Sequence, residues 1–199
     1  MIRSPLCPRC GLPYPTCEGN DHLCEDCLKS VYSFTSARST GQFETLLRDL
    51  IHRFKYQGQV AVGEKLGRFM AESDYVDFRI ADYSLMIPIP LHRKRLQDRG
   101  FNQSVILSRE ISRYHGIPMR FDVLKRTIYT EPQVSLGRDD RNRNVQGAFE
   151  VTERGAIEGE RILLIDDVYT TGSTVNECAG VLRQSGAEDV SVLTLARGL

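Results

Sequence analysis

The feature that most constrains this chain is an apolar run, 162–165, that leads directly into two adjacent carboxylates, Asp166 and Asp167. Apolar residues without polar alternation are typical of a parallel strand that is buried on both faces. The two acids therefore come at the carboxyl end of the predicted strand, which is the edge where open α/β sheets bind their ligands. The run thus predicts a parallel sheet and also the position of its site.

A hydroxyl-rich turn, 170–174, follows the two acids and opens a predicted helix. The helix is indicated by an apolar stripe with helical spacing, made of Val175, Cys178, Ala179 and Leu182. Backbone N–H groups at a helix start bind anions, so the turn suits a phosphate, while the carboxylates suit sugar hydroxyls. A ribose 5-phosphate satisfies both ends. The plainer alternative is a capped helix with solvated acids; a Walker A loop is excluded because no lysine follows Gly172.

Four cysteines form two Cys-x-x-Cys pairs, which are Cys7 with Cys10 and Cys24 with Cys27. Such pairs predict a zinc ribbon, because each knuckle presents two thiolates to one tetrahedral ion and the segment has little apolar surface of its own. We therefore predict a structural Zn²⁺ with these four ligands in a ribbon over residues 1–33. Disulfides, free thiols, or Cys17 or His22 in place of one ligand are the alternatives.

Apolar residues at helical spacing predict a helical hairpin over residues 43–73. Lys55 and Tyr56 fall at its bend, and we interpret them mainly as the end of the first helix. Residues 31–40 indicate a strand or an extended connection, residues 84–90 predict the first strand of the sheet, and residues 190–196 predict a closing strand.

A basic segment, 91–103, follows the predicted strand 84–90 and carries four cationic residues. We interpret it as a loop at a strand end, where a pyrophosphate would find its counter-charge. The predicted pyrophosphate loop consists of Leu91, His92, Arg93 and Lys94. The candidates for stabilising a leaving group are Arg93, Lys94 and Arg95. A solvated basic loop is the alternative.

Residues 125–147 fit neither the helical nor the strand period and are rich in Arg, Asn and Gln. Long irregular segments in compact domains are often functional lids, so we expect a mobile loop here.

The composition sets limits on partners and location. The 199 residues include 26 basic and 26 acidic side chains, so no overall charge draws the chain to nucleic acid or to a membrane. No apolar run approaches the roughly 20 residues that a membrane helix needs, and the first residues lack the apolar core of a signal peptide. We expect a soluble cytoplasmic protein, in which clustered cysteines favour metal binding over disulfides.

Residues 162–174 resemble the signature of type I phosphoribosyltransferases, which bind phosphoribosyl pyrophosphate (PRPP). The resemblance implies the fold of that family over residues 34–199, a parallel sheet flanked by helices. It implies that Asp166 and Asp167 hold the ribose hydroxyls and that Mg²⁺ accompanies PRPP. It also implies that the 5′-phosphate is held by the turn residues Thr170, Thr171, Gly172, Ser173 and Thr174.

Further matches narrow the resemblance to the ComF family. Besides the ribbon and Lys55-Tyr56, they are Pro88 to His92, Arg99 to Gln103, Arg126, Pro132-Gln133, Arg141, Asn144 and Gly147 to Phe149. The family is linked with natural competence, the uptake of transforming DNA. Many members carry an additional pair of cysteine knuckles, so we expect this chain either to have a single-zinc ribbon or to begin late.

The resemblance implies a competence protein that binds PRPP and Mg²⁺ and that, as an enzyme of nucleotide metabolism, would transfer ribose 5-phosphate to an acceptor with release of pyrophosphate. The alternative is a non-catalytic, PRPP-responsive adaptor that binds single-stranded DNA or a competence helicase. A scaffold without ligand binding is disfavoured by the intact Asp-Asp turn. The residues identify neither a general base nor an acceptor pocket.

Overall fold

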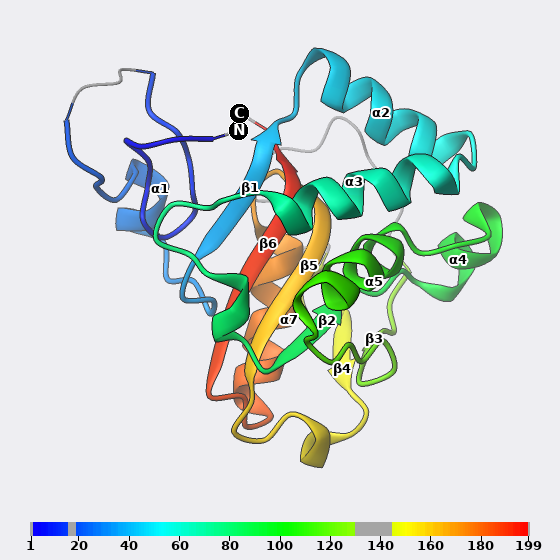
Figure 1. Ribbon diagram of the computed structural model, residues 1–199. Coiled ribbons are helices and arrows are strands. Elements are labelled where there is room, and N and C mark those ends of the chain that lie inside the picture. Colours follow the sequence, from blue (N-terminus) through cyan, green and yellow to red (C-terminus); the bar gives the residue numbers. More distant parts are fainter. Residues whose placement is uncertain (1, 16–18, 130–144, 199) are drawn as a thin grey trace.

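The computed structural model describes residues 2–15, 19–129 and 145–198, and its centre is a parallel sheet in the order β1-β6-β5-β2 (Figure 1). The strands of this sheet are β1 (Ala37–Gln42), β2 (Leu85–Pro88), β5 (Arg161–Tyr169) and β6 (Asp189–Arg197). A short antiparallel hairpin is formed by β3 (Leu124–Arg126) and β4 (Phe149–Val151). The predicted parallel sheet is therefore confirmed.

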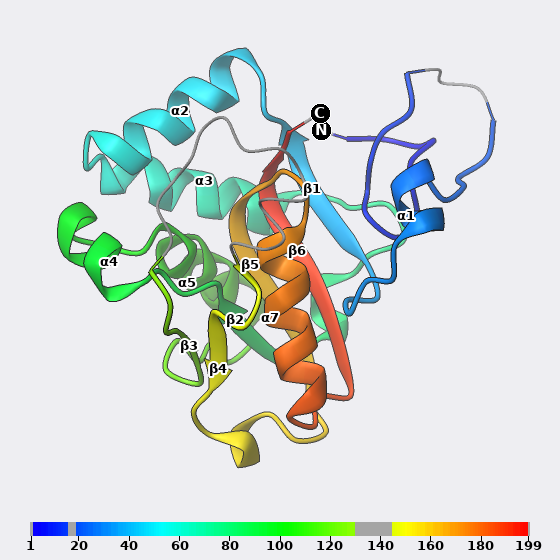
Figure 2. The same ribbon diagram turned by 180° about the vertical axis from the view of Figure 1, so that it is seen from behind.

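Helices cover both faces of the sheet (Figures 1 and 2). One face carries α2 (Thr45–Tyr56), α3 (Val60–Glu72) and α5 (Gln103–His115), and the other carries α7 (Ser173–Gln184). Shorter elements include the helices α1 (Glu25–Lys29) and α4 (Arg93–Arg99) and the 3-10 turns Ile80–Asp82 and Arg154–Ala156.

Successive residues of β5 enter two different core clusters. Leu163 and Ile165 pack with apolar residues of α2, α3 and α5, whereas Ile162 and Leu164 pack with those of α7. A strand that is buried on both faces needs apolar residues at every position, which explains the unbroken run. The predicted fold class, a parallel sheet flanked by helices, is thus confirmed.

Two of the predicted elements were wrong. The first strand of the sheet is β1 and not 84–90; β1 overlaps the segment 31–40, which was interpreted as a strand or an extended connection. Most of its buried residues are polar, and Ser39 Oγ makes a hydrogen bond of 2.6 Å with Thr194 Oγ1. The basic segment is largely the helix α4, which begins at the cap His92 and ends at Gly100, whose φ of 81° suits a helix end. Of the predicted loop 125–147, residues 130–144 lie outside the described residues.

The N-terminal segment packs on the edge of the sheet. The four cysteines belong to the same core cluster as Ala37 of β1 and Tyr169 of β5. The backbone N–H of Ala37 donates to the Arg9 carbonyl at 2.7 Å, and Arg38 Nη1 donates to the Pro8 carbonyl at 2.9 Å. The first cysteine knuckle therefore covers part of the edge that β1 would otherwise expose.

Within the described residues, no helix is both long enough and apolar enough to cross a membrane.

The hairpin of α2 and α3 gives a test of the core packing. A Cβ at Gly63 would lie 2.2 Å from Cε2 of Phe54, whose buried ring stacks on Phe101 with centroids 5.4 Å apart. We predict that Gly63→Ala lowers the free energy of unfolding by about 1–3 kcal/mol, although alanine favours a helix over glycine by roughly 1 kcal/mol. Urea denaturation measures the change. The exposed neighbour Glu64→Ala should alter stability by less than about 0.5 kcal/mol; a Gly63→Ala protein as stable as this control would refute the packing.

Candidate functional site

Asp166 and Asp167 lie inside β5 rather than after it. The strand continues to Tyr169 because β6 pairs with it as far as Arg197. Asp167 is buried and Asp166 is partly buried. Oδ1 of Asp166 accepts hydrogen bonds from the Ser104 hydroxyl of α5 at 3.0 Å and from the backbone N–H of Asp167 at 2.9 Å. The two carboxylates are thus held by the sheet and by the start of α5.

Lys55 forms an ion pair with Oδ2 of Asp167, and both side chains are largely buried. The interpretation of Lys55 as a plain helix end was therefore incomplete, because the end of α2 reaches the carboxylate pair. A signal was present in the sequence. Lys55 is four residues after Ile51 and next to Phe54, so it lies on the helix face that is otherwise buried.

Burial brings the ionisation of this cluster near neutral pH. The pKa of Asp166 is raised to about 6 by burial, although Lys55, Ser104, Arg126 and Arg99 oppose that rise. The pKa of Lys55 is lowered to about 8, again by burial, and the charge of Asp166 opposes that change. Both directions follow from the cost of removing a charge from water.

The turn after β5 has the predicted form. It ends at Gly172, whose φ of 80° is left-handed, and α7 begins at Ser173. The hydroxyls of Thr171 and Ser173 are 2.7 Å apart, and the Ser173 N–H donates to Thr171 Oγ1 at 3.4 Å. The predicted phosphate residues therefore surround the first turn of a twelve-residue helix, where backbone N–H groups favour an anion.

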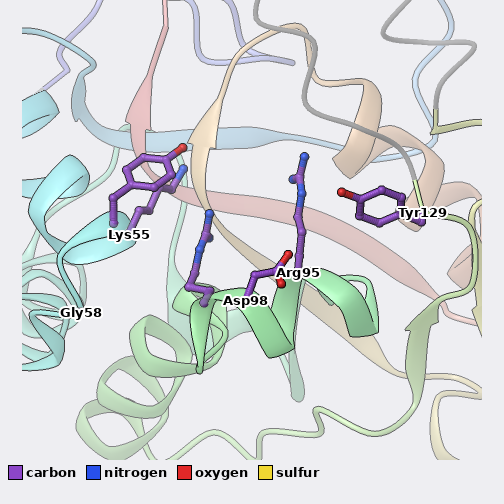
Figure 3. Close-up of a pocket in the computed structure, with 7 residues that line it drawn as sticks. Lys55, Gly58, Arg95, Asp98 and Tyr129 are labelled. Carbon is purple, nitrogen blue, oxygen red and sulfur yellow. The ribbon is translucent and has the colours of Figure 1, made fainter.

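A cavity of about 330 Å³ lies between the end of α2, the helix α4 and the segment after β3. Figure 3 shows Arg95 reaching between Lys55 on one side and Tyr129 on the other. Three cationic side chains and one carboxylate line the cavity, so its charge is positive; its lining residues are Lys55, Tyr56, Gly58, Arg95, Asp98, Arg99 and Tyr129. Lys55 belongs both to this cavity and to the ion pair with Asp167.

The residues predicted to bind pyrophosphate are only partly brought together here. Arg95 lines the cavity, and Lys94 lies over the ring of Tyr129 at 4.5 Å. His92 caps α4 by accepting a hydrogen bond from the Lys94 N–H at 3.2 Å, and Leu91 precedes it. Arg93 is exposed at the start of α4 and is not a lining residue.

Arg99 and Arg126 also belong to the surroundings of the carboxylates. Burial lowers the pKa of each guanidinium, and in both cases the charge of Asp166 opposes this effect. Arg99 Nη1 donates to Gln103 at 2.5 Å, and the Arg99 guanidinium lies 5.5 Å from the ring centroid of Tyr56. The sequence motifs contained these arginines but did not show that both lie close enough to influence the ionisation of Asp166.

The four predicted zinc ligands come together in a compact group. Their sulfur atoms all lie within 4.8 Å of one another, and all four side chains are buried. The sulfurs of Cys10 and Cys24 are 3.7 Å apart, close to the value of about 3.8 Å that a tetrahedral ion with Zn–S bonds of roughly 2.3 Å requires. The group could bind a metal ion such as zinc.

The pKa values of the thiols support the same view. The pKa of Cys7 is lowered to about 4 by a hydrogen bond with Cys10, and that of Cys10 is raised by the same bond and by burial. The buried thiols of Cys7 and Cys10 thus compete for a proton, whereas a dication would stabilise the thiolate form of its ligands. His22 does not join the group but stacks on Tyr14 with centroids 4.1 Å apart. Cys17 lies outside the described residues.

Solved structures with a similar arrangement include a glutamine PRPP amidotransferase from Bacillus subtilis, with 20% identity and a TM-score of 0.45. The match covers 66% of this chain and 25% of that chain. A purine phosphoribosyltransferase from Pyrococcus horikoshii has 16% identity and a TM-score of 0.42, with coverage of 67% and 71%. No protein-family model matches the chain.

Sequence relatives cover nearly the whole chain. Competence protein F of Haemophilus influenzae is 35% identical over 97% of this chain and 85% of its own length. The DNA utilization protein YhgH of Escherichia coli K12 is 32% identical over 98% and 85%, and competence protein ComFC of Bacillus subtilis is 27% identical over 98% and 79%. With its parallel sheet and its N-terminal cysteine group, the chain therefore belongs to the ComF family of competence proteins.

Proposed function

We propose that the chain binds PRPP together with Mg²⁺ at the carboxyl end of β5. Asp166 and Asp167 would accept hydrogen bonds from the ribose hydroxyls, and the turn 170–174 would hold the 5′-phosphate. The observation that carries the proposal is the pair of buried and partly buried carboxylates, which lies next to a helix-opening turn and shares Lys55 with a cationic cavity. A sugar polyphosphate such as PRPP combines the groups that these three parts suit.

The cavity is the proposed place of the pyrophosphate. Its cations Lys55, Arg95 and Arg99 outnumber its one carboxylate, Asp98, so a polyanion would be stabilised there. Mg²⁺ prefers oxygen ligands and substrate phosphates, and when bound it would neutralise part of this charge. A carboxylate accepts several hydrogen bonds, so Asp167 can keep its ion pair with Lys55 and still accept from a ribose hydroxyl.

The proposed reaction is transfer of ribose 5-phosphate. An acceptor would form a bond with the anomeric carbon while the bond from that carbon to pyrophosphate breaks, and both electrons of the broken bond leave with pyrophosphate. Arg95, Arg99 and Lys55 would stabilise the leaving group, and the buried carboxylates would keep the ribose in place. We place this activity in competence-linked DNA uptake because the relatives are named as competence and DNA utilization proteins.

A second candidate is an adaptor that binds PRPP and single-stranded DNA without any transfer. It is favoured by the names of the relatives and by the basic, tyrosine-lined cavity, because bases stack on aromatic rings beside cations. Release of labelled pyrophosphate from PRPP in the presence of candidate acceptors would support the enzyme. Salt-dependent binding of single-stranded DNA without pyrophosphate release would support the adaptor.

The assignment of the carboxylates predicts a loss of PRPP affinity in an Asp166→Asn, Asp167→Asn double variant. Hydrogen bonds to a charged group contribute about 1.5–3 kcal/mol each, so the dissociation constant should rise roughly 100-fold or more. Calorimetric titration with PRPP and Mg²⁺ measures it. Asp49→Asn changes a largely exposed carboxylate and should leave the affinity unchanged. Equal affinity in the double variant and the wild type would remove the site.

The ionisation of Lys55 leads to a prediction of how PRPP affinity depends on pH. Its pKa of about 8 means that it loses its charge as the pH rises above that value, and the affinity should then fall. In Lys55→Arg the cation persists, because arginine keeps its charge far above this range, so the affinity should stay level between pH 7 and pH 9. Titrations at several pH values compare the two proteins. The assignment of Lys55 fails if both show the same decline.

The cysteine group predicts one Zn²⁺ per chain with a structural role. Cys27→Ser should abolish stoichiometric zinc and lower the free energy of unfolding by on the order of 3 kcal/mol or more, since structural zinc binds with roughly 10–16 kcal/mol. Metal analysis and thermal denaturation measure both effects. Cys178→Ala removes a buried cysteine of α7 that is not in the group and should keep the zinc. A wild-type protein that contains no zinc, or whose stability does not change when its zinc is removed, would contradict the prediction.

A further inference from the structure

Arg197, buried at the end of β6, connects the cysteine group to the sheet. Its Nη1 donates a hydrogen bond to the Cys10 carbonyl at 2.6 Å, and its Nη2 lies 3.4 Å from the Cys10 sulfur. One guanidinium thus contacts both the main chain and the sulfur of a proposed zinc ligand. Such outer hydrogen bonds orient metal ligands, and their loss commonly weakens metal binding by about 10–100-fold.

The same guanidinium stacks on Tyr169, its register partner in β5. Cζ of Arg197 is 4.4 Å from the ring centroid, and both side chains are buried. Cations bind aromatic faces more strongly where water is excluded. Phe34, in the segment that leads from the ribbon to β1, meets the same ring edge-on with centroids 6.3 Å apart. The ring of Tyr169 is therefore held by residues from both the ribbon side and the sheet.

The Tyr169 hydroxyl lies against the backbone of the turn that opens α7, at Gly172. A Cβ at Gly172 would be 2.3 Å from Tyr169 Oη, so the backbone of the turn rests on the phenol. The hydroxyl is buried and has no hydrogen-bond partner among the described residues. The turn is thus supported here by ring contact, and a shift of the ring would displace the amides of residues 170–174.

We propose that metal binding at the cysteine group and phosphate binding at the turn are coupled through Arg197 and Tyr169. The inference rests on the proposed function, because it takes Zn²⁺ and PRPP as the two ligands. The metal fixes Cys10, Cys10 places Arg197, Arg197 holds the ring of Tyr169, and the ring supports Gly172. Arg197 and Tyr169 are positioning residues, since they act through Cys10 and the turn.

Thermodynamic linkage provides the test. PRPP with Mg²⁺ must strengthen zinc binding by the same factor by which zinc strengthens PRPP binding, and factors of about 5–150 are usual for coupled sites. We expect at least a fivefold gain in zinc affinity on saturation with PRPP, measured by competition with a chromogenic chelator. PRPP also binds zinc in solution. The same measurement on the double variant Asp166→Asn, Asp167→Asn, which should have lost its PRPP affinity, gives the size of that effect so that it can be subtracted.

Arg197→Met removes the link but keeps all four cysteines and the whole turn. It should still take up one zinc and bind PRPP, while each ligand leaves the affinity for the other unchanged. Arg161→Met is a matched control, because Arg161 stacks on Tyr83 at 5.7 Å near the opposite end of β5, and it should keep the coupling.

Should Arg197→Met fail to fold, Arg197→Lys retains the charge but loses the planar fork. Coupling that persists in the folded Arg197 variant, or that is missing in a wild type that binds PRPP, overturns the proposal.

Hydrogen exchange separates this inference from the proposed function. With zinc bound and PRPP absent, the amides of residues 170–174 should exchange faster in Arg197→Met than in the wild type and in Arg161→Met. If the wild type does not bind PRPP, the proposed function fails, yet faster exchange at the turn still supports the link from the ribbon. Unchanged exchange at the turn overturns the link in either case.

Discussion

Two neighbouring carboxylates at the end of β5, Asp167 buried and Asp166 partly buried, impose the constraint on which the rest of this structure depends. An ionised carboxylate that is removed from water without compensation costs several kcal/mol. The chain meets this cost with groups from separate elements, which are Lys55 of α2, Arg99 of α4, Ser104 of α5 and Arg126 of β3. The helical hairpin, the short basic helix and the small β-hairpin can all be understood as supports that bring these groups to one place.

That compensation also prepares the site for a ligand. Burial raises the pKa of Asp166 to about 6 and lowers that of Lys55 to about 8, so both groups change their charge within a short range of neutral pH. The adjoining cavity is not balanced, because Arg95 and Arg99 add positive charge that Asp98 only partly offsets. A ligand with hydroxyls at one end and several phosphates would therefore exchange water for groups that are already in place, which reduces the cost of binding.

The sequence predicted the parts of the structure that local patterns control. An apolar run, a helical stripe and two cysteine spacings were sufficient for β5, for α7 and for the metal group. Contacts between distant residues were missed: Arg197 lies 187 positions from Cys10, and Lys55 reaches Asp167 from the end of another element. β1 was predicted only loosely, as a strand or an extended connection over 31–40, because polar residues such as Ser39, which bonds to Thr194 across the sheet, give it no apolar pattern.

The pairing of β1 with β6 has a consequence for synthesis on the ribosome. Their partners are about 155 residues apart, so β1 emerges long before the strand that completes it. During that interval an apolar edge would invite association between nascent chains. The polar residues Arg38, Ser39 and Thr40 make the waiting edge hydrophilic. The polar composition of β1 thus keeps this strand hydrophilic until the sheet can close.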